Sequence, residues 1–79
     1  MIDVSLPELR AFVTVAQQRS FRRAADLAGV SRSSLSHALR ALERRLGTRL
    51  LHRTTRSVAL TEAGNQLLAR LAPMLGEMD

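Results

Sequence analysis

The sequence contains no cysteine, tryptophan, tyrosine or lysine. Without cysteine it forms neither disulfides nor thiolate metal sites. Its two histidines, His37 and His52, do not have the spacing of a known zinc site, so we expect no metal and no cofactor. No nucleophile motif such as G-x-S-x-G accompanies its serines, and we expect no enzyme. The only aromatic residues, Phe12 and Phe21, fall on apolar stripes, which leaves no platform for stacking single-stranded bases.

Long apolar runs are also missing. Hydrophobic residues make up 46% of the chain, but they are spread at helical intervals, and no run approaches the ~20 residues of a membrane span. The N-terminus, Met-Ile-Asp-Val-Ser, lacks the basic start and apolar stretch of a secretory signal. The 79 residues suffice for one small domain. We therefore expect a cytoplasmic protein with no membrane partner.

Acidic residues are scarce in the middle of the chain, where arginines gather. Twelve basic residues, all of them arginine, outnumber seven acidic ones and give a net charge of +5. The stretch from Arg40 to Arg56 holds six arginines and a single acid, Glu43. Arginine suits phosphates and the guanine edge, so this stretch predicts a phosphate-facing surface. GC-rich codons would explain the arginine content equally well, and an ordinary solvated face is the alternative for the stretch.

The first helix is expected to be scaffold. It begins at Ser5-Leu6-Pro7-Glu8, which has the form of a capping box, and ends near Gln17-Gln18-Arg19. Its apolar positions recur every three or four residues and form one stripe. They are Leu6, Leu9, Phe12 or Val13, and Ala16.

A second and a third helix follow with a short turn between them. Ser20 caps the second helix, Gly29 ends it, and Val30 plugs the turn. Ser31 caps the third helix, which ends at Gly47. The inward positions are Phe21, Ala24, Ala25 and Ala28 in the second helix, and Leu35, Ala38 or Leu39, Leu42 and Leu46 in the third. This is the helix-turn-helix pattern, in which the second member lies in the major groove of DNA.

The remainder predicts a wing and a fourth helix. Residues 50–52 and 58–60 are expected to form two short strands around a polar, basic loop. Thr61 caps a helix that Pro73 interrupts and bends. The apolar residues of this helix approximate a coiled-coil seam for dimerisation and are Leu67, Leu68, Leu71, Leu75 and Met78. The expected fold is therefore mainly α: a winged helix-turn-helix domain over residues 1–60, then a long linker or dimerisation helix over residues 61–79.

A set of residues in fixed order and spacing extends this pattern over nearly the whole chain. They are Phe12, Ser20-Phe21, Ala24-Ala25, Leu27, Val30-Ser31, Ser36, Leu39, Leu42-Glu43, Leu46-Gly47, Leu50, Arg53-Thr54, Leu60-Thr61 and Ala63-Gly64. Together they resemble the N-terminal signature of LysR-type transcription regulators. The resemblance implies a linker helix that pairs two subunits and an effector-binding domain beyond it. Three residues depart from the family pattern: Arg32, His37 and Leu51. Arg32 and His37 lie on the face that reads DNA, so their departure concerns which base sequence is recognised and not the function.

The expected DNA contacts lie at the starts of the second and third helices, on the outer face of the third helix and on the wing. They are Arg22, Arg23, Ser31, Arg32, Ser33, Ser34, Ser36, His37, Arg40, Arg53, Thr54 and Arg56.

Each group of these residues has a plainer alternative. In the alternative for the serines, Ser31 caps the third helix and the others are solvated. The alternative for Arg22, Arg23 and His37 is plain exposure to solvent. The alternative for Arg53 is that it holds the wing to the helices. Arg44, Arg45 and Arg49 either continue the basic face or pair with acids.

The leading hypothesis is sequence-specific binding of double-stranded DNA by a homodimer on an inverted repeat in a bacterial, nucleoid-associated regulator. For the full-length protein, a tetramer is a further candidate assembly and RNA polymerase a further candidate partner. The alternatives are a non-specific architectural DNA binder and a helical protein-interaction module without a DNA role.

Overall fold

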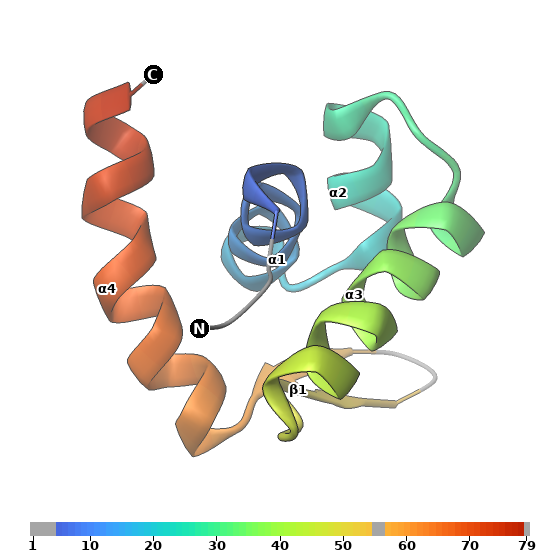
Figure 1. Cartoon of the computed structure of the whole chain (residues 1–79). Helices are drawn as coiled ribbons and strands as arrows, with labels where there is room; N and C mark the ends of the chain where they lie inside the picture. Colours follow the sequence, from blue (N-terminus) through green and yellow to red (C-terminus); the bar gives the residue numbers. More distant parts are fainter. Residues whose placement is uncertain (1–4, 55–56, 79) are drawn as a thin grey trace.

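The computed structural model describes residues 5–54 and 57–78. Within these residues, four helices and a two-stranded antiparallel sheet follow one another along the chain (Figure 1). The elements are α1 (Leu6–Gln18), α2 (Phe21–Ala28), α3 (Arg32–Leu46), β1 (Leu51–Arg53), β2 (Val58–Leu60) and α4 (Glu62–Met78). The fold class is the one expected, a mainly α winged helix-turn-helix with a further helix after the wing.

Serine hydroxyls begin the first three helices, as their positions in the sequence predict. The Oγ atoms of Ser5, Ser20 and Ser31 each accept a hydrogen bond from the backbone N–H three residues further on, at 3.4, 3.2 and 3.0 Å. Gly29 and Gly47 end α2 and α3 with a φ of 72°, in the left-handed region that glycine adopts at low cost. Local chemistry therefore sets these helix boundaries.

The expected capping box at α1 forms only in part. Ser5 caps the helix, but the Glu8 carboxylate makes an ion pair with Arg45 near the end of α3. The charge of Arg45 is thereby engaged by an acid, which is one of the two alternatives that the sequence left open. The pair also fixes the start of α1 against the far end of α3.

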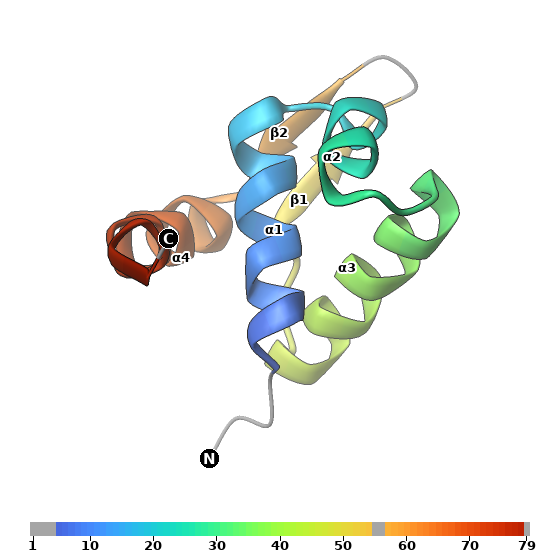
Figure 2. The same ribbon diagram turned by 90° about the horizontal axis from the view of Figure 1, so that it is seen from above.

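Helix α1 is the centre of the fold and contacts each of the other three helices (Figures 1 and 2). The core is entirely apolar. It consists of Phe12, Val13, Val15, Ala16, Ala24, Ala25, Leu35, Leu39, Leu42, Leu50, Leu51 and Val58. All three predicted stripes contribute to it, and Leu51 is fully buried.

Four expectations about the helices and their turn need correction. Leu6 is 40% exposed because the packed face of α1 begins one turn later, at Leu9. Val15 is fully buried although it lies off the predicted stripe, since α1 packs against helices on several sides. Ala28 is exposed at the end of α2. Val30 is 46% exposed and does not plug the turn, which a hydrogen bond from its N–H to the Ala25 carbonyl closes instead, at 3.1 Å.

The wing is a short hairpin whose first strand lies one residue later than predicted. Arg53 pairs with Val58 and belongs to β1, not to the loop. Thr54 and Ser57 close the end of the hairpin, with the Thr54 N–H donating to the Ser57 carbonyl at 2.9 Å. Pairing with Val58 therefore fixes the backbone of Arg53 within the hairpin.

Helix α4 leaves the wing and packs against α1 and β2. Thr61 caps it, because its Oγ1 accepts from the Gly64 N–H at 3.0 Å while donating to the Arg49 carbonyl at 2.7 Å. Pro73 lies inside the helix, which continues past it, so the predicted interruption is wrong (Figure 1). Within the described residues no helix is both long and apolar enough to cross a membrane.

Candidate nucleic-acid interface

Helix α3 has one buried and one exposed face, as expected of a recognition helix. Leu35, Leu39 and Leu42 are 3% exposed or less. On the opposite side the charged and polar side chains are exposed, and they are Arg32, Ser33, His37 and Arg40. The buried leucines hold the helix rigidly against α1 and α2, so the exposed side chains have a fixed position relative to the rest of the domain.

The first turn of α3 offers free backbone donors beside these side chains. Ser31 Oγ takes the N–H of Ser34, and the Ser31 carbonyl takes that of Leu35. The N–H groups of Arg32 and Ser33 then have no acceptor within the described part of the chain. Backbone N–H groups at a helix N-terminus favour an anionic partner such as a phosphate oxygen.

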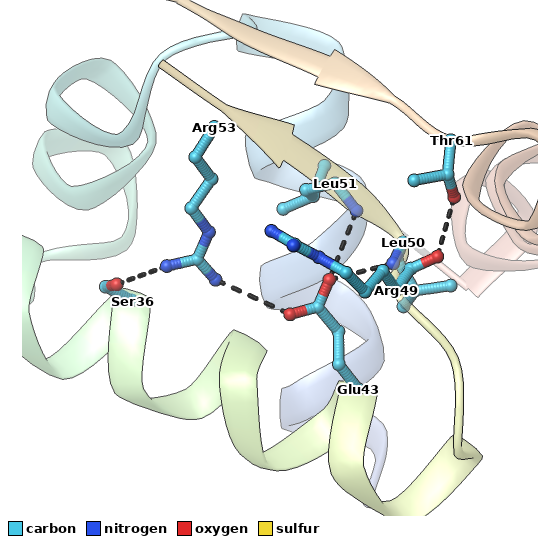
Figure 3. Close-up of polar contacts among 7 residues, drawn as sticks. All are labelled: Ser36, Glu43, Arg49, Leu50, Leu51, Arg53 and Thr61. Atoms are coloured by element: carbon cyan, nitrogen blue, oxygen red, sulfur yellow. Dashed lines mark hydrogen bonds and ion pairs between the residues drawn. The ribbon is translucent and has the colours of Figure 1, made fainter. Parts of the chain in front are cut away.

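A network of three polar side chains joins α3 to the wing (Figure 3). Glu43 Oε2 accepts hydrogen bonds from the backbone N–H groups of Leu50 and Leu51, at 2.8 and 3.2 Å. Glu43 Oε1 lies 3.8 Å from Arg53 Nη2, and Arg53 Nη1 donates to Ser36 Oγ at 2.6 Å. The acid that interrupts the basic stretch therefore ties the first strand of the wing to α3.

Arg53 is held in place on three sides. Its side chain is 18% exposed, and its guanidinium carbon lies 4.7 Å above the centre of the Phe21 ring, a cation–π contact. Burial lowers the pKa of Arg53; Glu43 opposes this effect, whereas Arg40 and Arg49 add to it. These contacts show the structural alternative for Arg53, namely that it holds the wing to the helices. A contact with DNA stays a prediction.

Most of the predicted DNA-contacting side chains meet around one groove between α3 and the wing. Its polar and basic lining consists of Arg32, Ser33, Ser36, His37, Arg40, Arg53 and Thr54. Phe21 and Val58 form its apolar part, and none of the described residues that line it is acidic. Ser36 accepts a hydrogen bond from Arg53, which leaves its O–H as a donor and one lone pair as an acceptor.

Two neighbouring grooves extend this surface in both directions. Towards the end of α3, a groove shares Arg40 and Arg53 with the first and adds Arg44 and Arg49. Towards α2, another shares Arg32 and Thr54 and adds Arg19 and Arg22. Glu43 is the single acid among the described residues that line the three, and its carboxylate is occupied by backbone N–H groups. The result is one continuous basic surface.

The remaining predicted contacts lie elsewhere. Ser34 lines a separate, mostly apolar hollow between α1, α2 and α3. Arg23 is exposed on α2 but lines none of the three basic grooves. Ser31 is exposed as the cap of α3. Arg56 lies outside the described residues. Their contacts with DNA stay predictions.

Sequence reasoning missed Arg19 and made no choice about Arg44 and Arg49. Arg44 and Arg49 belong to the basic stretch, but their common groove becomes visible only when the turn at Gly47 brings β1 back towards α3. Arg19 was interpreted only as the end of the first helix. The available signal was its position directly before the capping Ser20, where the chain must turn without a glycine.

The predicted seam on α4 is used partly within the chain itself. Leu67, Leu68 and Leu71 are half-buried and pack against the core. The side chains of Leu75 and Met78 lie outside the described part of the structure. The boundary between residues 60 and 61 and the role of the seam in dimerisation both stay predictions.

Comparison with known proteins identifies the family. The model of the bacterial regulatory helix-turn-helix proteins of the lysR family matches residues 6–65. The chain belongs to the LysR family. It is 50% identical over 78 residues to the uncharacterized HTH-type transcriptional regulator YfeR of Shigella flexneri, covering 99% of this chain and 25% of that protein. It is 54% identical over 74 residues to the HTH-type transcriptional regulator PgrR of Escherichia coli K12, covering 94% and 25%.

Solved structures of LysR-type regulators have the same fold. The BenM DNA-binding domain in a complex with catB site 1 DNA is 34% identical with a TM-score of 0.90, covering 96% of this chain and 85% of that one. Oxidized OxyR of Corynebacterium glutamicum is 43% identical with a TM-score of 0.87, covering 94% and 23%. The chain spans about a quarter of the length of the curated relatives it matches. It is a LysR-type DNA-binding domain of transcriptional regulators, a family of regulators and not of enzymes.

Proposed function

We propose that this LysR-type domain recognises a specific double-stranded DNA sequence, with α3 in the major groove and the wing against the backbone. The groove between α3 and the wing carries the proposal, since its lining combines base-reading and phosphate-binding side chains without an acid. The solved relatives support it, because one is described as the BenM domain with catB site 1 DNA and another as full-length CbnR with its target DNA.

The side chains of this groove divide into two kinds by position. Arg32 and His37 lie on the exposed face of α3 near its N-terminus, the part of a recognition helix that contacts base edges. Arg40, Arg44 and Arg49 lie towards the other end of α3 and around the turn that follows it. We assign the first pair to base recognition and the second group to phosphates.

Replacing Arg32 or His37 by alanine is expected to weaken binding to the preferred site by about 1–3 kcal/mol and to relax the preference at one or two base pairs. Arg49→Ala is expected to weaken the preferred site and random duplex about equally. The measurement is a set of binding curves on the preferred site, its single-base variants and random duplex. Site preference that survives in both α3 variants but is lost in the Arg49 variant would show that the assignment is inverted.

We further propose that two copies pair through α4 and place their recognition helices on the two halves of an inverted repeat. Half-buried leucines on α4 and the heptad-like spacing of Leu75 and Met78 support this pairing. In a full-length regulator, pairs of dimers and contact with RNA polymerase on bacterial chromosomal DNA in the cytoplasm belong to the same proposal.

Ending the chain after Leu71 is expected to turn a dimer into a monomer. This truncation removes Leu75 and Met78 but keeps the α4 leucines that pack on the core, so the domain itself should remain folded. Sedimentation equilibrium of both chains, with circular dichroism as the check of folding, makes the comparison. A dimer that survives the truncation contradicts the seam, and a monomeric intact chain shows that α4 alone does not pair.

A further inference from the structure

The C-terminus of α1 has an unusual backbone conformation. Arg19 has φ 52° and ψ 32°, and it is the only residue other than glycine with a positive φ among those that the structure describes. Its N–H donates to the Val15 carbonyl at 2.8 Å and ends the helix. Helices α2 and α3 end with the same geometry at Gly29 and Gly47. A side chain makes this conformation unfavourable, so the arginine at the end of α1 carries an energetic cost that glycine would avoid.

The described residues offer the Arg19 side chain no polar contact that compensates for that cost. The Arg19 side chain is exposed, and it has no ion pair or hydrogen bond with any residue in the described part of the chain. A residue held in a sparsely populated conformation points to a role outside the fold itself.

The side chain lies where two other arginines meet. Arg19, Arg22 and Arg32 line one groove, and they come from the end of α1, the start of α2 and the start of α3. Thr54 and Ser57 of the wing form its far side, and none of the described lining residues is an acid. Three like charges repel each other in the absence of a counter-charge, and Arg22 also lies at the positive end of the α2 dipole. An anion in this groove would relieve both effects.

The position of the groove identifies the anion. It shares Arg32, Thr54, Phe21 and Val58 with the groove between α3 and the wing. A duplex lying on α3 therefore continues its backbone past this point. We propose that Arg19, together with Arg22, binds a backbone phosphate of the DNA beside the base pairs that α3 reads through Arg32, and that this contact accounts for an arginine at a position suited to glycine. The inference rests on the proposed function of α3.

The test compares two replacements with opposite properties in the full 79-residue chain. Arg19→Gly relieves the backbone and removes the charge, whereas Arg19→Lys keeps both the charge and the unfavourable conformation. Arg70→Ala is the matched control, because Arg70 is exposed on α4 and its loss changes the net charge equally. The probes are the preferred duplex and a random-sequence duplex, each titrated at several salt concentrations.

For Arg19→Gly we expect a Tm about 4 °C above that of the wild type. On both duplexes its affinity should fall about fivefold, and its log–log salt slope should be smaller by about 0.9, one phosphate contact. Arg19→Lys and Arg70→Ala should retain the wild-type slope. If Arg19→Gly has lost its fold, Arg19→Asn replaces it, since asparagine also tolerates the left-handed region.

An unchanged slope in the Arg19→Gly variant overturns the inference, and so does an equal loss in the Arg70→Ala control. A loss confined to the preferred duplex also overturns it, because a phosphate contact does not depend on sequence. Failure of the wild-type chain to bind any duplex would instead contradict the proposed function, which distinguishes the two outcomes.

Discussion

Replacing Glu43 by alanine is expected to lower the free energy of unfolding by about 4 kcal/mol. The Glu43 carboxylate accepts the N–H groups of Leu50 and Leu51, whose residues are 1% and 0% exposed, and it faces the guanidinium of Arg53. Without the carboxylate, two buried N–H groups lose their acceptor and Arg53 loses its counter-charge. The start of the wing should then separate from α3.

Urea denaturation followed by circular dichroism measures this effect. Glu43→Gln should lie between the wild type and the alanine variant, because the amide keeps an acceptor oxygen but not the charge. Glu62→Ala, on the exposed first turn of α4, is the matched loss of an acid and should change stability by less than about 1 kcal/mol. An alanine variant of Glu43 as stable as the Glu62 variant contradicts the role assigned to the network.

Replacing Gly64 by alanine is expected to lower the free energy of unfolding by about 3 kcal/mol. A Cβ atom at this position would overlap the carbonyl oxygen of Leu50 and lie 3.1 Å from the carbonyl carbon. It would also lie 3.2 Å from Cδ2 of Leu60. The obstruction is the backbone of Leu50, which cannot move aside as a flexible side chain can, so α4 would have to shift away from this residue.

The direction of the change in stability at Gly64 is informative, because helix propensity and packing predict opposite effects. Gly64 lies inside a helix, where alanine is otherwise favoured by about 1 kcal/mol. Gly47→Ala is the control: its φ is 72° but nothing lies within 4 Å of the position that a Cβ would take, so only the backbone cost of about 1 kcal/mol should appear. Urea denaturation of the two variants gives the comparison. A Gly64 variant that is more stable than the wild type would rule out close packing of α4 on the wing.

The helices could be predicted because their signals are local. Ser20 and Ser31 begin helices through hydrogen bonds to N–H groups three residues away, and Gly29 and Gly47 end them. The sequence did not indicate how much of the surface of each helix the other helices bury. Val15 is buried and Leu6 is exposed because of how the other helices pack around α1.

The sequence indicated most of the residues that line the candidate site, but not the contacts among them. The charge pattern indicated the basic surface, yet the roles of Arg53 and Glu43 depend on the hairpin register and on contacts between residues far apart in sequence. Arg53 lies in β1 where the sequence predicted a loop, and its side chain contacts Ser36. Arg19 remained unnoticed because its φ is a property of the fold, which residue type and spacing did not indicate.

The most direct test of the account is selection of bound sequences from random duplex DNA, followed by titration of the selected and random duplexes at several salt concentrations. Reading by α3 predicts that the selected duplex binds at least about 10³-fold more tightly than the random one. The basic surface predicts that both affinities fall steeply with salt, by about 0.9 log unit for each phosphate contact per log unit of salt. Equal affinity for the two duplexes, or binding that does not respond to salt, would contradict the account.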